Sequence, residues 1–321
     1  WAGVIEGRWQ ALDVEAMRGY LARGGTMLGT SRIHPWMTDD GVDRARATMA
    51  DIGLDALIVI GGEGSLATAH RAHTESLVPV VGVPKTIDND VPCTEQTFGF
   101  DTAVSIATEA IDRLHTTAES HDRVMVVEVM GRHVGHIATW AGIAGGATVT
   151  LIPEHPFDIA AVAEIVRKRH ERGRYASIVV VAEGARPAPG TMDLDEPEVD
   201  RFGHKRLGGI AVAVASELEQ RTGYETRVTV LGHVQRGGSP TAYDRVLSSR
   251  YGVAAIDAVH EGGLGYMVAL QAGLIACVPL ADVMGHLKTV DDRLWDVANA
   301  LFEARLDGRP QARDDGGSAS P

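Results

Sequence analysis

The chain has 321 residues, 45% of them hydrophobic and 23% charged, and a mass of 34.1 kDa, which suits a globular protein of one large or two medium domains. Its net charge of -13 and pI near 5.4 argue against nucleic acid and anionic membranes as partners. Two distant cysteines, Cys93 and Cys277, lack metal-ligand spacing, and no apolar run reaches the length of a membrane span, so we expect a cytoplasmic location.

The first elements lead to a glycine-rich strand end. We expect three of them before it: a short helix at 13–22, a loop at 23–32 and a helix at 40–49. The apolar run 54–60 is typical of a buried strand and stops at Gly61-Gly62-Glu63-Gly64-Ser65. Glycines let the main chain approach an anion, and a helix opening near Ser65 directs its N–H groups at it. This turn is therefore a candidate phosphate site.

Glu63 is an unusual neighbour for a phosphate. A carboxylate there is explained by a bridging divalent cation, because Mg²⁺ is commonly held by one or two carboxylates together with substrate phosphates. The alternative is a tight strand-to-helix turn with a solvated glutamate.

A second strand end is more specific. The strand at 78–83 is followed by Pro84-Lys85-Thr86-Ile87-Asp88-Asn89-Asp90. If the backbone stays extended, Thr86, Asp88 and Asp90 project to one side. An Asp so placed can accept a proton from a sugar hydroxyl while its neighbour helps to hold metal. The alternative is an exposed Asn/Asp turn.

Strands and helices alternate through the rest of the chain. Helices are expected at 101–115, from about 134, at 159–171, 209–221, 243–259 and 291–305. Strands are expected at 124–129, 148–152, 177–182, 226–231 and 267–270. The polar insert 186–205 is expected to be a surface loop or lid, and the tail 306–321 to be disordered. Repeated strand–helix units predict a doubly wound α/β fold.

Three of these strands carry polar residues at their ends. The strand at 124–129 ends at Met130-Gly131-Arg132, and the strand at 177–182 ends at Glu183, which can bind sugar hydroxyls or face water. The strand at 226–231 ends at Gly232-His233-Val234-Gln235-Arg236, where His233 and Arg236 can share a phosphate. A core histidine and a helix-side arginine are the alternatives. Arg123 and Arg227 lie at the opposite strand ends.

Four motifs in this order closely resemble the phosphofructokinase family, enzymes that phosphorylate the 1-hydroxyl of fructose 6-phosphate: 61–65, 85–90, 128–132 and 231–238. The likeness runs from about Arg23 to about Asp296. The resemblance implies two similar doubly wound lobes with mainly parallel sheets. A phosphoryl-donor lobe would comprise 1–99 and 235–285, and a sugar-phosphate lobe 100–234 and 286–305.

The resemblance also implies residue roles. We expect Asp88 to take the hydroxyl proton, Thr86 and Arg132 to steady the phosphoryl group, and Glu63 with Asp90 to place Mg²⁺. Fructose 6-phosphate would be bound by Thr86, Ile87, Asp88, Arg123, Met130, Gly131, Arg132, Glu183, Arg227, His233, Val234, Gln235 and Arg236. The donor would be bound by Arg32, Gly62, Glu63, Gly64, Ser65 and Lys85. Arg123 and Arg227 would reach a neighbouring subunit's site, implying a homo-oligomer, a dimer or tetramer.

Two positions bear on the phosphoryl donor. Gly64 leaves room for the rest of a nucleotide, whereas pyrophosphate users of the family commonly carry Asp there. Lys85 is typical of those pyrophosphate users. Because a side chain at position 64 would sterically exclude a nucleotide, we give Gly64 more weight than Lys85. We therefore expect ATP as the donor, with pyrophosphate as the alternative.

The family's opening strand and Gly-Gly-Asp-x-Pro-Gly-x-Asn nucleotide loop have no match before residue 23, so we expect an N-terminally truncated sequence. A non-catalytic sugar-phosphate-binding homologue is therefore the alternative of another class. A periplasmic-type sugar receptor is disfavoured by the absence of an export signal and by Glu63 with two aspartates, which sugar binding does not require.

Overall fold

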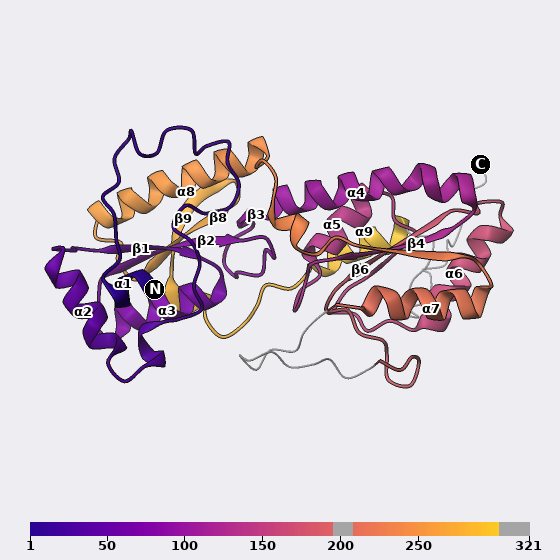
Figure 1. Ribbon diagram of the computed structural model, residues 1–321, viewed down its shortest axis with the longest axis horizontal. Helices are drawn as coiled ribbons and strands as arrows, with labels where there is room; N and C mark the ends of the chain where they lie inside the picture. The colour runs from indigo at the N-terminus through magenta and orange to yellow at the C-terminus, as the bar shows by residue number, and fades with distance from the viewer. Residues whose placement is uncertain (195–207, 302–321) are drawn as a thin grey trace, which may run out of the picture.

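Two lobes, each built around its own sheet, lie side by side along the long axis of the molecule (Figure 1). The computed structural model describes residues 1–194 and 208–301. The first sheet has the strand order β1-β2-β8-β9, with β3 beside β2, and the second has the order β5-β6-β4-β7. Every pair is parallel except β8 with β9. The predicted α/β fold with mainly parallel sheets is confirmed.

All predicted strands are present. The strands are β1 Leu57–Gly61, β2 Val80–Thr86, β3 Phe98–Gly99, β4 Val124–Val129, β5 Val149–Leu151, β6 Ser177–Ala182, β7 Thr226–Val230, β8 Tyr266–Gln271 and β9 Leu274–Pro279. β3 and β9 were not predicted. β9 follows β8 through a two-residue turn in which Ala272 and Gly273 both have positive φ, 49° and 76°. Such turns usually carry Asn-Gly or Asp-Gly, and Ala-Gly gave no such signal.

The helices follow the predicted alternation except before residue 23, where the short N-terminal helix was not expected. They are α1 Ala2–Glu6, α2 Gly41–Asp51, α3 Glu63–Thr74, α4 Phe100–His121, α5 His136–Ala144, α6 Ile159–Glu171, α7 Ile210–Thr222, α8 Ala242–His260 and α9 Asp292–Leu301. The predicted helix at 13–22 is wrong: this stretch forms turns and is almost entirely exposed. A short helix needs a packed apolar face, and this one has none. No helix among the described residues is long and apolar enough to cross a membrane.

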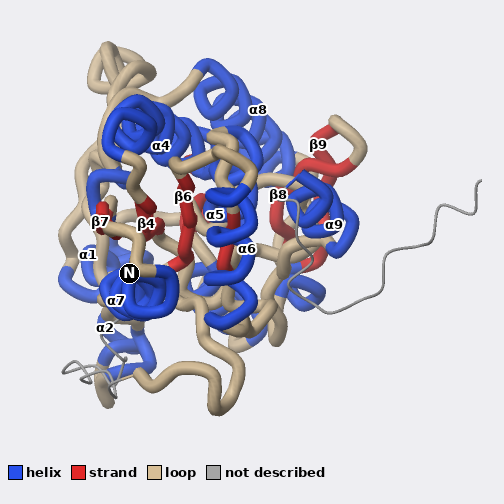
Figure 2. The backbone as a smooth tube through the Cα atoms, turned by 90° about the vertical axis from the view of Figure 1, so that its right-hand side faces the viewer, coloured by secondary structure: helices blue, strands red, loops and turns tan. Residues whose placement is uncertain are grey.

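Helices cover both faces of each sheet because successive residues of a buried strand point to opposite faces. In β4, Met125, Val127 and Val129 pack toward α4 and α5, whereas Val124 and Val126 pack toward α6 and α7. Figure 2 shows β7, β4 and β6 as a layer between α4 and α7. The first sheet is covered by α2 and α3 on one face and α8 on the other.

The chain crosses between the two lobes three times (Figure 1). The crossings follow β3, pass through the 3-10 helix η2 Gly232–Arg236 after β7, and run between the 3-10 helix η3 Leu280–Val283 and α9. The proposed lobes, 1–99 with 235–285 and 100–234 with 286–305, each contain one sheet. The predicted insert lies partly, and the tail entirely, outside the described residues.

Candidate active site

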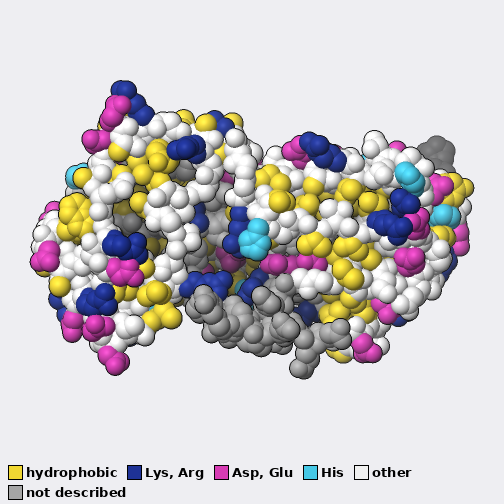
Figure 3. All heavy atoms as spheres, in the orientation of Figure 1, with side chains coloured by type: hydrophobic (Ala, Val, Ile, Leu, Met, Phe, Trp, Pro, Cys, Tyr) yellow, Lys and Arg dark blue, Asp and Glu magenta, His cyan; other side chains and the backbone are white. Residues whose placement is uncertain are grey.

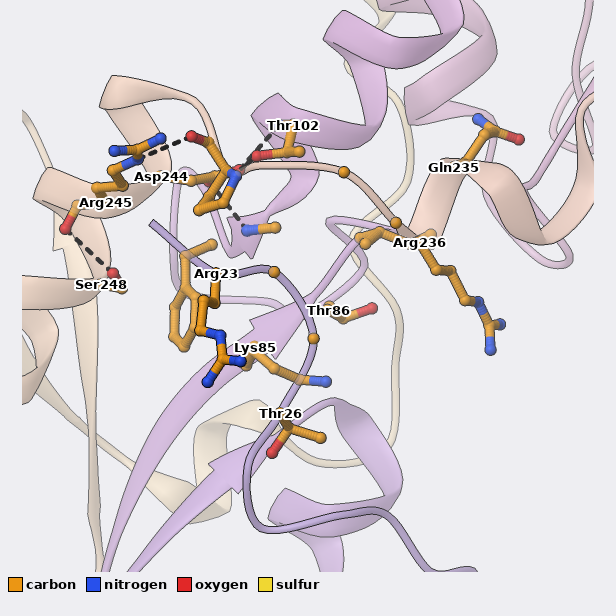
Figure 4. Close-up of a pocket in the computed structure, with 18 of the residues that line it drawn as sticks. Arg23, Thr26, Lys85, Thr86, Thr102, Gln235, Arg236, Asp244, Arg245 and Ser248 are labelled. Atoms are coloured by element: carbon orange, nitrogen blue, oxygen red, sulfur yellow. Dashed lines mark hydrogen bonds between the residues drawn. The ribbon is translucent and has the colours of Figure 1, made fainter. Parts of the chain in front are cut away.

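A cavity of about 540 Å³ lies where the lobes meet. Its walls come from the end of β2, the turn before α3, η2, the start of α8 and the loop at 20–30. Charged side chains of both signs gather in the hollow between the lobes (Figure 3). Figure 4 shows Lys85, Thr86 and Arg236 on the side of this cavity opposite Asp244 and Arg245. The cavity thus collects residues from segments far apart in the chain.

The acidic loop after β2 is tightly folded, and the extended backbone expected there is wrong beyond Thr86. The Asp88 N–H donates to Thr86 Oγ1 at 3.1 Å, and Asn89 takes a left-handed φ of 54°. Thr97 closes the loop: its N–H donates to Asn89 Oδ1 at 3.0 Å and its hydroxyl to the Thr86 carbonyl at 2.7 Å. These local bonds, rather than strand alternation, set the directions of Asp88 and Asp90.

Asp88 lines the cavity together with Lys85 and Arg236. Burial raises the pKa of Asp88, while the nearby Arg236, Thr86, His133 and Arg132 oppose that rise. Burial, followed by the charge of Arg236, lowers the pKa of Lys85, and Asp88 opposes this. A half-buried carboxylate surrounded by cations is suited to accept a proton beside an anionic substrate.

Asp90 is partly buried, like Asp88, but lies outside the cavity lining. Its Oδ1 atom is shut off from solvent and has no hydrogen-bond partner among the described residues. Burial, together with the charges of Asp88 and Glu63, raises the pKa of Asp90 to about 6. Three carboxylates therefore lie close enough to interact.

This set fits a magnesium ion shared with substrate. In residues 1–194 and 208–301, no group of three or more His, Cys, Asp or Glu side chains forms a metal site by itself. Mg²⁺ is usually bound by one or two carboxylates plus phosphate oxygens and water. The exposed Glu63 at the start of α3 and the unpartnered oxygen of Asp90 supply such donors.

The end of β4 packs against β6 and η2. The Met130 N–H donates to Gln235 Oε1 at 2.7 Å, the Glu183 N–H to the Val129 carbonyl at 2.9 Å, and the Gly184 N–H to the Gly131 carbonyl at 3.0 Å. Burial raises the pKa of Glu183, and Arg132 opposes this. Glu183 and Arg132 therefore lie close enough at this sheet edge for their charges to interact.

Gly131 cannot accept a side chain without strain, which gives a stability prediction. Its φ is +144°, and an added Cβ would lie 2.7 Å from the Val134 carbonyl oxygen. We expect Gly131→Ala to lower the free energy of unfolding by about 1–3 kcal/mol in urea denaturation. Gly252→Ala on exposed α8, where nothing lies within 4 Å, should instead raise it by about 0.5–1 kcal/mol. Equal stability of the two variants would contradict the assignment of strain.

The η2 residues separate into two groups. Gln235 and Arg236 line the cavity, and Gln235 is buried. His233 and Val234 are exposed and lie outside the lining. The structure therefore does not bring His233 and Arg236 together in this cavity, and their predicted shared phosphate stays a prediction.

Arg123 and Arg227 meet at the opposite edge of the second sheet. Both pair with Glu225, Arg123 through its Nε atom at 2.8 Å. This edge is the amino end of β4 and β7, away from Met130 and Arg132. Within this chain the two arginines do not line the cavity.

On the donor side, Gly62 and Lys85 line the cavity, whereas Arg32, Glu63, Gly64 and Ser65 lie outside its lining. Gly62 precedes α3, and an added Cβ at Gly64 would meet nothing within 4 Å. The loop at 23–32 does contribute, but through Arg23, Gly24, Gly25, Thr26 and Thr30. The loop was therefore predicted as part of the donor side, but the cation that lines the cavity is Arg23 and not the expected Arg32.

Two further residues were missed. His133 is near enough to oppose the rise in the pKa of Asp88. Asp244 is buried and accepts hydrogen bonds from the N–H groups of Gly99 (2.9 Å) and Thr102 (2.8 Å) at the start of α4. A capping pattern, Thr241 followed three residues later by Asp244, was the available signal for the start of α8, but it did not reveal the contact with α4.

Comparisons with known proteins agree on one family. A family model described as phosphofructokinase matches residues 1–259. The pyrophosphate–fructose 6-phosphate 1-phosphotransferase of Streptomyces coelicolor is 55% identical over 94% of this chain and 88% of its own length. The ATP-dependent 6-phosphofructokinase of Mycobacterium tuberculosis (strain H37Rv) is 58% identical over 88% of this chain and 82% of its own. The phosphofructokinase structure from Saccharomyces cerevisiae superposes with a TM-score of 0.77 and 31% identity, covering 94% of this chain and 41% of that one.

Proposed function

The chain belongs to the phosphofructokinase family, and on that premise we propose that it transfers the γ-phosphoryl group of ATP to the 1-hydroxyl of fructose 6-phosphate. The observation that carries this proposal is the placement of Asp88 on the cavity wall, beside Lys85 and Arg236 and close to Arg132. It provides a proton acceptor and positive charge at the same point.

In the proposed reaction Asp88 accepts the proton of the 1-hydroxyl as the hydroxyl oxygen attacks the γ-phosphorus in line, and the bond from that phosphorus to the bridging oxygen breaks to release ADP. Thr86, Arg132 and Arg236 stabilise negative charge on the reacting phosphate. The transition state of such transfers is loose, so catalysis rests on positioning and charge neutralisation. Glu63 and Asp90 would hold Mg²⁺, which when bound neutralises charge on the phosphates of the donor.

The sugar phosphate is proposed to lie against the end of β4, between Met130, Gly131 and Arg132 and the acid Glu183. Arg123 and Arg227 are proposed to complete the site of a second copy, because the opposite edge of the sheet keeps them from the cavity of their own chain. The protein would then be a homo-oligomer with shared sites. The cytoplasmic location predicted from its cysteines belongs to the same proposal.

ATP is proposed as the donor because Gly64 leaves open space beside the start of α3. The specific observation favouring pyrophosphate instead is Lys85, which lines the cavity, together with a relative at 55% identity that is named for pyrophosphate.

Assays with each donor test the proposal. The protein is incubated with fructose 6-phosphate, Mg²⁺ and either ATP or pyrophosphate, and fructose 1,6-bisphosphate is quantified. We expect product with ATP, and product with pyrophosphate alone would overturn the choice of donor. Calorimetric binding of fructose 6-phosphate without product from either donor would identify a non-catalytic homologue.

A further inference from the structure

The third crossing between the lobes consists of residues 284–291 (Figure 1) and includes Lys288, which contacts the acidic loop that carries Asp88. The Lys288 ammonium donates three hydrogen bonds to that loop. Its acceptors are Asn89 Oδ1 at 2.8 Å, the Thr94 carbonyl at 2.9 Å and the Glu95 carbonyl at 3.0 Å. An ammonium has three donors, so this side chain is fully used by one loop.

The backbone of Lys288 connects the same loop to the other lobe. Its N–H donates to the Asp90 carbonyl at 2.9 Å. Its carbonyl lies 2.9 Å from Nε2 of the buried His136 on α5, and since a carbonyl only accepts, that nitrogen carries the proton. The Val290 N–H donates to Glu154 Oε1 at 3.2 Å, and this bond attaches the following part of the crossing to the second lobe.

Asn89 is the residue through which Lys288 can act on Asp88. Asn89 lies between Asp88 and Asp90, it is buried, and its φ of 54° belongs to the left-handed region. Left-handed residues other than glycine persist where their surroundings hold them. Here the holding contacts are the Lys288 ammonium and the Thr97 N–H, both bound to Asn89 Oδ1.

The setting of Lys288 also argues for a specific role. Burial lowers the pKa of Lys288 to about 8, and the charges of Asp90 and Glu95 oppose that fall. A lysine that is partly withdrawn from water loses hydration free energy, which fixed acceptors must replace. All three acceptors of its side chain belong to residues 89–95, so the compensation depends on the loop keeping this conformation.

We propose that Lys288 is a positioning residue for phosphoryl transfer: by fixing Asn89 and the Asp90 carbonyl from the crossing between the lobes, it holds Asp88 in the orientation that accepts the sugar proton. This rests on the proposed function, since only there is Asp88 the proton acceptor. Lys288 does not itself touch the substrates. It couples the geometry of the loop to the position of the second lobe, which contributes Arg132 and Glu183.

The test compares Lys288→Met, which keeps the length of the stem and loses all three donors, with Lys168→Met at an exposed position of α6. We expect Lys288→Met to lower kcat about 30- to 300-fold, because small misplacements of catalytic groups cost on the order of 10²-fold. The KM values for fructose 6-phosphate and donor should stay within about threefold, since no binding group is removed. Lys168→Met should leave all three constants unchanged.

A double variant adds a second criterion. Asn89→Ala combined with Lys288→Met should lower kcat by less than the product of the two single losses, because each change removes the contact between Lys288 and Asn89. A kcat of Lys288→Met within threefold of the wild type would overturn the proposal, as would multiplied losses in the double variant. If Lys288→Met does not fold, Lys288→Arg replaces it in the test. The same criterion then applies: kcat should fall while the KM values stay constant.

Amide hydrogen exchange separates this proposal from the proposed function. A wild-type protein without transferase activity would overturn the proposed function alone. Loss of protection at the Thr97 and Lys288 amides in Lys288→Met, with unchanged exchange in Lys168→Met, would still support the holding of the loop. Equal protection in both variants would overturn it.

Discussion

Asp88→Asn should lower kcat about 10²–10⁴-fold while the KM for fructose 6-phosphate changes little. The amide has nearly the same shape as the carboxylate, and the backbone N–H of residue 88 still donates to Thr86 Oγ1, so the loop keeps its fold. What is lost is the group that accepts the hydroxyl proton. Steady-state kinetics of the purified variant under saturating donor measures the effect.

The control is Asp43→Asn, which removes the same charge from an exposed position in the first turn of α2 and should retain full kcat. The pH profile gives a second measure. Because burial raises the pKa of Asp88, wild-type activity should begin to fall on acidification above the usual range for aspartate, near 4. Unchanged turnover in Asp88→Asn would remove Asp88 from the proposed role.

Much of the fold followed from local patterns. The runs 124–129 and 177–182 are apolar on both faces, and the structure places both strands at the centre of a parallel sheet, covered by helices on each face. Where local pattern failed, a distant contact decides the structure. β9 depends on pairing with β8 through an uncommon turn, and the stretch at 13–22 has suitable helical spacing but no surface on which to bury its apolar residues.

The candidate site was likewise predictable only in part. Strand ends pointed to Asp88 and Arg132 because parallel strands bring their carboxyl ends to one edge. The hydrogen bonds that hold the segments of the site together could not be predicted, since Thr97, Asp244 and Lys288 bind segments 11, 145 and 199 residues away in sequence. Motif spacing identifies which side chains gather, whereas the contacts that hold them depend on the completed tertiary structure.

Gly64→Asp should lower kcat/KM for ATP about 10²–10³-fold and leave kcat/KM for pyrophosphate within about threefold. In the family, Asp at this position is typical of enzymes that use pyrophosphate, and its carboxylate would face the α-phosphate of a nucleotide. Two like charges about 4–5 Å apart repel by roughly 3–4 kcal/mol at the effective dielectric constant of a protein surface, and each 1.4 kcal/mol is about tenfold. Parallel assays with the two donors measure the ratio.

Misfolding would not account for such a loss. An added Cβ at Gly64 meets nothing within 4 Å, and its place in the first turn of α3 favours a negative side chain through the helix dipole. Gly64→Ala is the matched control, because it adds the methyl group without the charge and should keep most of the ATP activity. If Gly64→Ala and Gly64→Asp reduced ATP use equally, steric crowding rather than charge would select the donor, and if neither did, Gly64 would have no part in that selection.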